Sequence, residues 1–127
     1  MKFRYAILYV DNVEETLTFY QTAFGFERLF LHESGQYGEL KTGDTKLAFS
    51  AKELMAQLGK TPGLADPAAP LFELAFETDD VAGAMQAAIA AGATEKQAPR
   101  DEPWGQTTGY VIDPNGFLVE LCTPMGD

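Results

Sequence analysis

The sequence is poor in the residues that build metal centres and disulfides. Its 127 residues include one cysteine, Cys122, and one histidine, His32. A single cysteine excludes an intramolecular disulfide and any cysteine-rich zinc site. The N-terminal stretch MKFRYAILYVDNVEE lacks a signal-peptide pattern, because its apolar run is short and ends at Asp11. We therefore expect a reducing, cytoplasmic location.

Basic residues and long apolar runs are also scarce. Nine lysines and arginines face 19 acidic residues, giving a net charge of −10. This balance argues against nucleic-acid binding, which needs a basic surface. No apolar run approaches the roughly 20 residues that span a bilayer, so no membrane partner is expected. The acidity favours a solvated surface, with a cationic ligand or partner as the sharper alternative.

What the sequence does contain is one pattern written twice. YVDNVEETLTFYQTAFGF (residues 9–26) and FETDDVAGAMQAAIAAGAT (residues 76–94) each read as a strand end, a capped helix and a glycine stop. Asn12 is the first predicted cap, and Asp79 or Asp80 is the second. Gly25 and Gly92 end the two helices. An internal repeat of this kind indicates two similar structural modules.

Strand-like runs complete each copy of the pattern. They are residues 3–10, 26–31, 37–42 and 46–50 in the first half, and 71–78, 94–98, 106–112 and 117–122 in the second. Each half therefore reads β-α-β-β-β. We predict one α+β domain over residues 1–127, with modules at about 1–50 and 70–123. A proline- and alanine-rich linker at about 51–69, beginning with a short helix, joins them.

Three blocks together resemble the vicinal oxygen chelate superfamily, also called the glyoxalase/bleomycin-resistance/dioxygenase family. They are ILYVDNVEETLTFYQTAFGF, LAFETDDVAGAMQAAIAAGA and PWGQTTGYVIDPNGFLVELCTP. The resemblance covers nearly the whole chain apart from the linker. It implies paired βαβββ modules with curled mixed sheets around a concave ligand cup, and usually a homodimer. It does not fix the function, because the family includes both metal enzymes and pure binding proteins.

The same resemblance implies where a metal would bind. The metal slots of the family fall on Tyr5, Ala48 (or Phe49), Glu73 and Glu120, and His32 falls on none of them. A catalytic zinc, nickel or iron site needs three or four good donors, usually including histidine. Here two carboxylates remain, Glu73 and Glu120, which could hold a hard cation such as magnesium or manganese with water.

Strand alternation predicts the ligand-binding residues. If the four slots face the cup, then so do Ile7 and Tyr9, and Tyr110 joins them by parity. Trp104 forms either a wall or lid of the cup, or a core or dimer contact. The predicted ligand-binding set is Tyr5, Ile7, Tyr9, Ala48, Glu73, Trp104, Tyr110 and Glu120. Apolar walls with a few polar groups are typical of ligand pockets.

Glu73 and Glu120 allow three interpretations. Each could be satisfied by a neighbouring basic or backbone group, the pair could bind an ammonium or guanidinium group, or it could transfer protons. We predict a small-molecule binding protein that needs no cofactor, with a cationic or aromatic ligand. The alternative is a lyase, isomerase or dioxygenase that uses a divalent metal such as Mn, Mg, Ni or Zn at Glu73 and Glu120, with Glu120 as the catalytic residue.

Overall fold

The chain runs through the same order of elements twice. The computed structural model describes residues 1–125. The first copy comprises β1 (Tyr5–Val10), α1 (Val13–Phe24), β2 (Glu27–Leu31), β3 (Tyr37–Lys41) and β4 (Lys46–Ala51). The short helix α2 (Lys52–Gln57) follows, and then the second copy: β5 (Glu73–Glu77), α3 (Val81–Ala91), β6 (Thr94–Asp101), β7 (Thr107–Ile112) and β8 (Leu118–Cys122).

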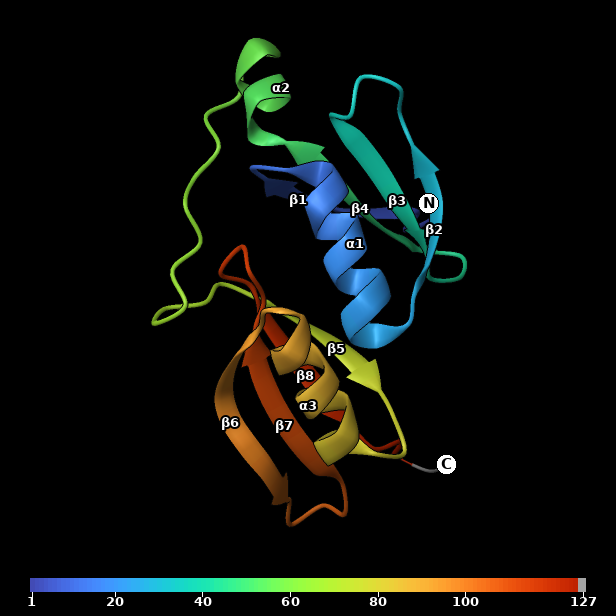
Figure 1. Cartoon of the computed structure of the whole chain (residues 1–127), viewed down its shortest axis with the longest axis vertical. Helices are drawn as coiled ribbons and strands as arrows, with labels where there is room; N and C mark the ends of the chain where they lie inside the picture. Colours follow the sequence, from blue (N-terminus) through green and yellow to red (C-terminus); the bar gives the residue numbers. More distant parts are fainter. Residues whose placement is uncertain (126–127) are drawn as a thin grey trace. The chain divides into compact units, whose positions relative to one another are not determined.

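Each copy folds into one four-stranded mixed sheet with a long helix on one face (Figure 1). The strand orders are β1-β4-β3-β2 and β5-β8-β7-β6. The pairs β1–β4 and β5–β8 are parallel, and the other pairs are antiparallel. The predicted α+β class and the βαβββ order of both halves are confirmed.

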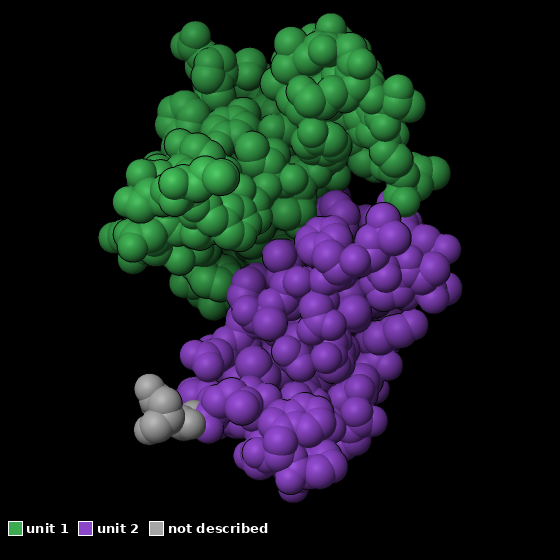
Figure 2. Space-filling model, turned by 180° about the vertical axis from the view of Figure 1, so that it is seen from behind, with its two compact units in different colours: residues 1–64 green, residues 65–127 purple. Residues whose placement is uncertain are grey.

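The chain divides into two compact units between Leu64 and Ala65 (Figure 2). This boundary lies inside the segment that the sequence predicts as a linker. The short helix expected at its start is α2, whose buried Met55 anchors it. Unit 1 contains the first sheet and unit 2 contains the second.

Helix α1 is fixed at both ends by the residues that the sequence indicates. The Asn12 side chain accepts a hydrogen bond from the Glu15 backbone N–H at 2.9 Å, and Gly25 adopts the left-handed conformation at φ 75°. Between them Val13, Leu17 and Tyr20 are fully buried. Burying such a side chain stabilises a fold by about 1.5–3 kcal/mol, so this stripe holds α1 against its sheet.

Helix α3 repeats the arrangement with smaller side chains. Asp80, one of the two predicted caps, accepts a hydrogen bond from the Gly83 N–H at 2.9 Å. Val81, Met85 and Ala88 are the buried residues of the helix.

Two glycines at matched positions let the helices approach their sheets. A Cβ at Gly38 in β3 would lie 2.6 Å from Cδ1 of Leu17, and one at Gly109 in β7 would lie 2.4 Å from Sδ of Met85. Neither position has room for a side chain. Gly38 and Gly109 therefore mark the helix-facing side of their strands.

Three strand boundaries differ from the sequence prediction by two residues or more. β1 begins at Tyr5 and β5 at Glu73, so Phe3 and Phe72, which the predicted strands include, lie outside the strands and are exposed. β6 extends past the predicted end at Ala98 to Asp101. Pro99 is tolerated there because β6 is an edge strand whose pairing with β7 shifts register between Gln97 and Arg100.

Candidate functional site

Each sheet has a face that points away from its long helix, which we call the far face. Gly38 pairs with Phe49 and Gly109 pairs with Leu121, so these positions face the helices. Because side chains alternate along a strand, their neighbours in the sequence face the other way. The far face of unit 1 carries Tyr5, Ile7, Tyr9, Tyr37, Glu39, Lys46, Ala48 and Ser50, and that of unit 2 carries Glu73, Ala75, Glu77, Thr108, Tyr110, Leu118, Glu120 and Cys122.

Acidic side chains dominate the far face of unit 2. Tyr110 and Glu120 are partners across β7 and β8, and the Tyr110 hydroxyl donates a hydrogen bond to Oε2 of Glu120 at 2.9 Å. Glu73 and Glu77 project from the adjacent strand β5. Within residues 1–125, none of the ion pairs includes Glu73, Glu77 or Glu120. The face therefore carries three carboxylates with no basic partner of this kind.

The Tyr110 phenol reports this electrostatic environment. Burial raises its pKa first, the hydrogen bond to Glu120 and the charge of Glu120 raise it further, and the charge of Glu73 adds to the effect. Both carboxylates thus lie close enough to act on one hydroxyl group. A neutral, hydrogen-bonded phenol beside two carboxylates is an arrangement that suits a positively charged group.

The pattern changes at the end of this face, where a carboxylate has a basic partner. Arg100 Nε donates to Oε1 of Glu102 at 2.6 Å, and the Thr108 hydroxyl donates to the same oxygen at 3.0 Å. The Glu102 side chain is only 7% exposed, and the hydrogen bond from Arg100 lowers the pKa of its carboxyl group. Glu102 is therefore already satisfied, unlike Glu120.

The loop between β6 and β7 carries Trp104. This side chain is 59% exposed, yet its indole N–H donates to Oε1 of Gln106 at 2.7 Å. Gln106 in turn donates from Nε2 to the carbonyl oxygen of Thr123 at 2.8 Å, just beyond β8. The polar edge of the indole is thus bonded within the protein, and its ring faces remain available for contact.

The far face of unit 1 is aromatic and balanced in charge. Lys46 lies 4.0 Å from Glu39, with side chains 27% and 13% exposed, and its ammonium group lies 5.5 Å from the centre of the Tyr5 ring. The Tyr37 hydroxyl donates to Oε2 of Glu39 at 2.7 Å. Burial, followed by the hydrogen bond to Glu39, raises the pKa of Tyr37. The one carboxylate here has both a phenol and an ammonium partner.

The structure distributes the eight predicted ligand-binding residues over both units. Tyr5, Ile7, Tyr9 and Ala48 lie in unit 1, and Glu73, Trp104, Tyr110 and Glu120 lie in unit 2. Tyr5, Ile7 and Trp104 are exposed. Ala48 is 0% exposed and lies in β4 between its pairing partners Ile7 and Glu39. The role of these residues in binding stays a prediction.

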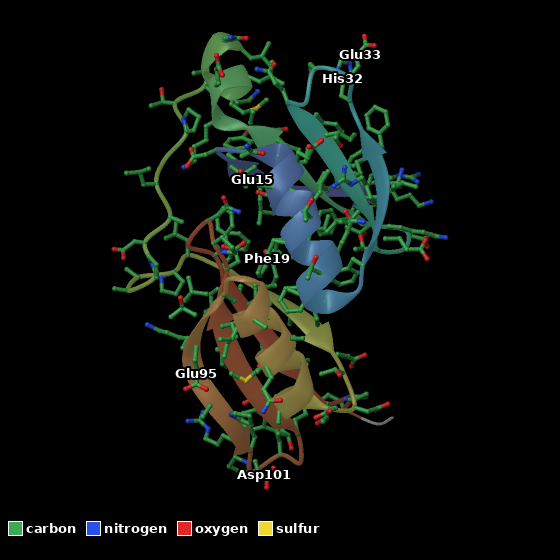
Figure 3. All side chains as sticks on the ribbon, in the orientation of Figure 1. Glu15, Phe19, His32, Glu33, Glu95 and Asp101 are labelled. Carbon is green, nitrogen blue, oxygen red and sulfur yellow. The ribbon has the colours of Figure 1, made fainter. Side chains whose placement is uncertain are left out.

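The single histidine and the single cysteine of the chain lie in different settings. His32 lies beside Glu33 at the turn after β2 (Figure 3), where its Nδ1 accepts a hydrogen bond from the Ser34 N–H at 3.0 Å. Cys122 is buried at the end of β8. Burial, together with the charges of Glu120 and Glu77, raises the pKa of its thiol, which disfavours the reactive thiolate.

The register of the strands places the four metal slots at equivalent positions, but their donors do not fit a catalytic metal. Tyr5 pairs with Lys46 as Glu73 pairs with Leu118, and Ala48 pairs with Ile7 as Glu120 pairs with Ala75. This register selects Ala48 over Phe49. Among the described residues, no three His, Cys, Asp or Glu side chains are grouped so that they could hold a metal. Ala48 offers no donor at all, and Glu120 is already bonded to Tyr110.

Comparison with known proteins now identifies the family. The model of the Glyoxalase/Bleomycin resistance protein/Dioxygenase superfamily matches residues 2–121. The chain belongs to this superfamily. No curated protein sequence matches the chain significantly.

Solved structures of the superfamily have the same fold. A glyoxalase-related enzyme from Fulvimarina pelagi is 22% identical, with a TM-score of 0.83, and the match covers 98% of this chain and 88% of that one. A glyoxalase/bleomycin resistance protein/dioxygenase family enzyme from Burkholderia phytofirmans is 28% identical, with a TM-score of 0.76 and coverage of 97% and 98%. A lactoylglutathione lyase from Agrobacterium tumefaciens is 19% identical, with a TM-score of 0.71 and coverage of 98% and 94%.

The sequence analysis missed several functional candidates whose side-chain hydrogen bonds and ion pairs no motif indicates. Glu39 and Tyr37 received no role, although they build the polar centre of the first face. Gln106 was read only as the start of a strand, although it binds Trp104. No pattern in the sequence indicated that Lys46 is the partner of Glu39. No helix among the described residues is long and apolar enough to cross a membrane.

Proposed function

We propose that the protein binds a small organic cation that carries an aromatic group, and that binding requires no metal. The observation that carries this proposal is the far face of unit 2, where Glu120 is paired with a phenol and no basic side chain of the described residues forms an ion pair with Glu73, Glu77 or Glu120. A cation supplied by a ligand would balance this charge.

An exposed aromatic side chain in the same unit supports the second half of the proposal. Trp104 is exposed and lies in the loop between β6 and β7 of unit 2, the unit that carries the acidic face. Aromatic rings bind flat groups by stacking and bind cations through the negative ring face. The net charge of −10 would also draw cations toward the protein and speed their association.

An enzymatic role is the second candidate. Glu73 and Glu120 both act on the Tyr110 hydroxyl, so two carboxylates gather at one point as a metal or acid–base site would require. On this interpretation the protein is a lyase, isomerase or dioxygenase that holds Mn, Mg, Ni or Zn through Glu73 and Glu120, with Glu120 also acting on the substrate. The missing donors at Tyr5 and Ala48 favour the binding role instead.

Three probes that share parts of one molecule test the binding role. Benzyltrimethylammonium carries both a ring and a charge, tetramethylammonium carries the charge alone, and benzyl alcohol carries the ring alone. Titration calorimetry should show the highest affinity for benzyltrimethylammonium, because only that probe can use both carboxylates and aromatic rings. Equal affinity for benzyl alcohol would contradict a role for the carboxylates.

Metal analysis separates the two candidates. The protein is produced in medium supplemented with Mn, Ni and Zn, and the bound metal is measured after gel filtration. The proposal expects less than one metal per chain and unchanged probe affinity after treatment with a chelator. Stoichiometric, tightly held metal would instead support the enzyme.

The resemblance in sequence also predicts a homodimer, which we carry forward as part of the proposal. Light scattering coupled to gel filtration measures the mass directly against the 13.9 kDa chain. A mass of one chain at micromolar concentration would contradict it.

A further inference from the structure

The indole of Trp104 is held by a chain of two hydrogen bonds that ends on the sheet of unit 2. Trp104 Nε1 donates to Oε1 of Gln106 at 2.7 Å, and Nε2 of Gln106 donates to the Thr123 carbonyl oxygen at 2.8 Å. An amide side chain has one acceptor end and one donor end. Gln106 uses both, so it joins the loop to the residue that follows β8.

The anchor of this chain is itself firmly placed. The Thr123 N–H donates to the Thr107 carbonyl oxygen at 3.0 Å, and the Thr107 N–H donates to the Thr123 hydroxyl at 2.9 Å. Thr123 thus continues the pairing of β8 with β7 by one residue. A side chain that is hydrogen-bonded to Thr123 is therefore held in place by the sheet and not only by its own loop.

The loop backbone brings Trp104 and Gln106 together. The Glu102 N–H donates to the Gln106 carbonyl oxygen at 2.8 Å, and the Gly105 N–H donates to the Glu102 carbonyl oxygen at 3.0 Å. Gly105 permits this tight turn, because it adopts φ 104°, which L-residues rarely do. Closure of the turn fixes the backbone, and the hydrogen bond to Gln106 adds a direct restraint on the Trp104 side chain.

Gln106 also reaches the far face of unit 2. Its side chain interacts with the thiol of Cys122, which is a far-face residue beside Glu77 in the pairing of β5 and β8. Trp104 is therefore tethered at the end of the face where Glu77 and Cys122 lie.

We propose that Gln106 is a positioning residue that holds the Trp104 indole as a fixed aromatic wall at the end of the acidic face, and so sets its preference for aromatic over non-aromatic cations. This inference rests on the proposed binding role, since the preference needs a bound cation. A ring that is fixed in advance loses little freedom on binding, which increases affinity without a new contact. A ring that rotates freely would lose most of this advantage.

Trp104 is the only tryptophan in the chain, so its fluorescence reports on this site alone. Gln106→Leu removes both hydrogen bonds and keeps a similar volume. Time-resolved anisotropy should then show faster indole motion, and acrylamide should quench the emission more strongly. Gln97→Leu is the matched control: Gln97 bonds Thr108 on the same sheet at 3.3 Å, and its loss should leave both signals as in the wild type.

The probe affinities test the second half of the inference. Gln106→Leu should weaken benzyltrimethylammonium binding by about fivefold or more while changing tetramethylammonium binding less than twofold, since only the ring uses the wall. Equal weakening of both probes would overturn the assigned role, because it would indicate a general distortion of the face. Unchanged anisotropy and quenching would overturn it as well.

A second variant keeps the test decisive if Gln106→Leu does not fold. Gln106→Glu retains an acceptor for the indole N–H but removes the donor to Thr123, so indole motion should rise above that of the wild type. No rise would overturn the two-bond chain. These fluorescence results need no ligand, so they stand or fall separately from the proposed function, which fails if none of the probes binds to the wild type.

Discussion

The two far faces come from the same repeated fold, yet they differ in how their carboxylates are partnered. On unit 1, Glu39 has Lys46 at 4.0 Å and the Tyr37 hydroxyl at 2.7 Å. On unit 2, Glu120 has a phenol partner, the Tyr110 hydroxyl, but no lysine partner within residues 1–125. Glu73 is close enough to act on the same phenol. A tyrosine–glutamate pair is thus common to both faces. The difference lies in Lys46 of unit 1 and in the two further carboxylates of unit 2, Glu73 and Glu77.

Equivalent positions show how this difference arose in the sequence. Lys46 of unit 1 corresponds to Leu118 of unit 2, because each is the partner of the matched residues Tyr5 and Glu73. Tyr9 and Ala48 correspond in the same way to Glu77 and Glu120. Exchanges at these equivalent positions therefore turn a balanced, aromatic face into an acidic one. The fold tolerates them, since far-face residues contribute less to the helix–sheet core than the residues that face α1 and α3.

The largest effect is expected from removing a charge on the acidic face. Glu120→Gln should weaken benzyltrimethylammonium binding by about tenfold or more, because a hydrogen-bonded charge contributes about 1.5–3 kcal/mol. Titration calorimetry measures the change. Glu95→Gln is the control: it removes the same charge from β6, at the position paired with the helix-facing Val111 (Figure 3). If the two variants behave alike, the carboxylate acts only through net charge.

The next largest effect is expected from adding a side chain where each long helix packs against its sheet. Gly38→Ala should lower the free energy of unfolding by about 1–3 kcal/mol, through overpacking against Leu17, and Gly109→Ala should lower it by less. A Cβ at Gly38 would also lie 3.2 Å from the Phe30 carbonyl oxygen, whereas at Gly109 the close contact is with the flexible Met85 side chain. Urea denaturation of both variants tests the order. An equal loss would mean that Leu17 moves aside as readily as Met85.

A smaller change should make unit 1 resemble unit 2. Lys46→Met removes the ammonium group beside Glu39 and keeps most of the apolar stem. Tetramethylammonium affinity should then rise about two- to threefold, since the first face would carry an uncompensated carboxylate. Lys41→Met is the control, because Lys41 in β3 pairs with Glu27 in β2 of the same sheet and both side chains are exposed. Weaker or unchanged binding in Lys46→Met, measured by calorimetry, would show that the charge of this face does not affect tetramethylammonium affinity.

The weakest effect concerns alkaline pH and should be shared by both units. The pKa values of Tyr37 and Tyr110 are both raised above the ordinary value of 10.0. Above pH 10 the unfolded chain loses these protons before the folded chain does. The stability that the two phenols contribute is therefore complete below pH 10 and is lost as the pH rises further.

Urea denaturation between pH 9 and 11 measures this loss, and absorbance at 295 nm follows the phenols directly. Tyr37→Phe and Tyr110→Phe should each flatten the alkaline fall in stability. If either phenol ionises near pH 10 in the folded protein, its hydrogen bond to the carboxylate is weaker than the geometry indicates.

Much of the fold was predictable because it depends on local chemistry. The caps Asn12 and Asp80, the stop at Gly25 and the buried stripe of α1 all follow from neighbouring residues, and the structure has each of them. The strand ends at Phe3, Leu71 and Ala98 were wrong, because strand ends depend on whether a partner strand extends beside them. No local pattern encodes that.

The candidate site was only partly predictable for the same reason. Parity placed Tyr5, Glu73 and Glu120 on one side of their strands, and the register agrees. The side-chain partners could not be predicted from the sequence. Tyr110 reaches Glu120 across β7 and β8, and Gln106 reaches Thr123 from the loop that precedes β7. Alternation also could not show that Ala48 has no exposed surface. That burial depends on the side chains of β1 and β3, which lie on either side of β4.

The sequence by itself determined the doubled βαβββ plan and the superfamily, because caps, glycine stops, strand alternation and residue types are written along the chain. Only the tertiary structure decided which carboxylate has a basic partner. Glu39 and Lys46 meet because β3 and β4 pair, and Tyr110 and Glu120 meet because β7 and β8 pair. The physical reason is that charge balance depends on distances between strands, which register sets and composition does not.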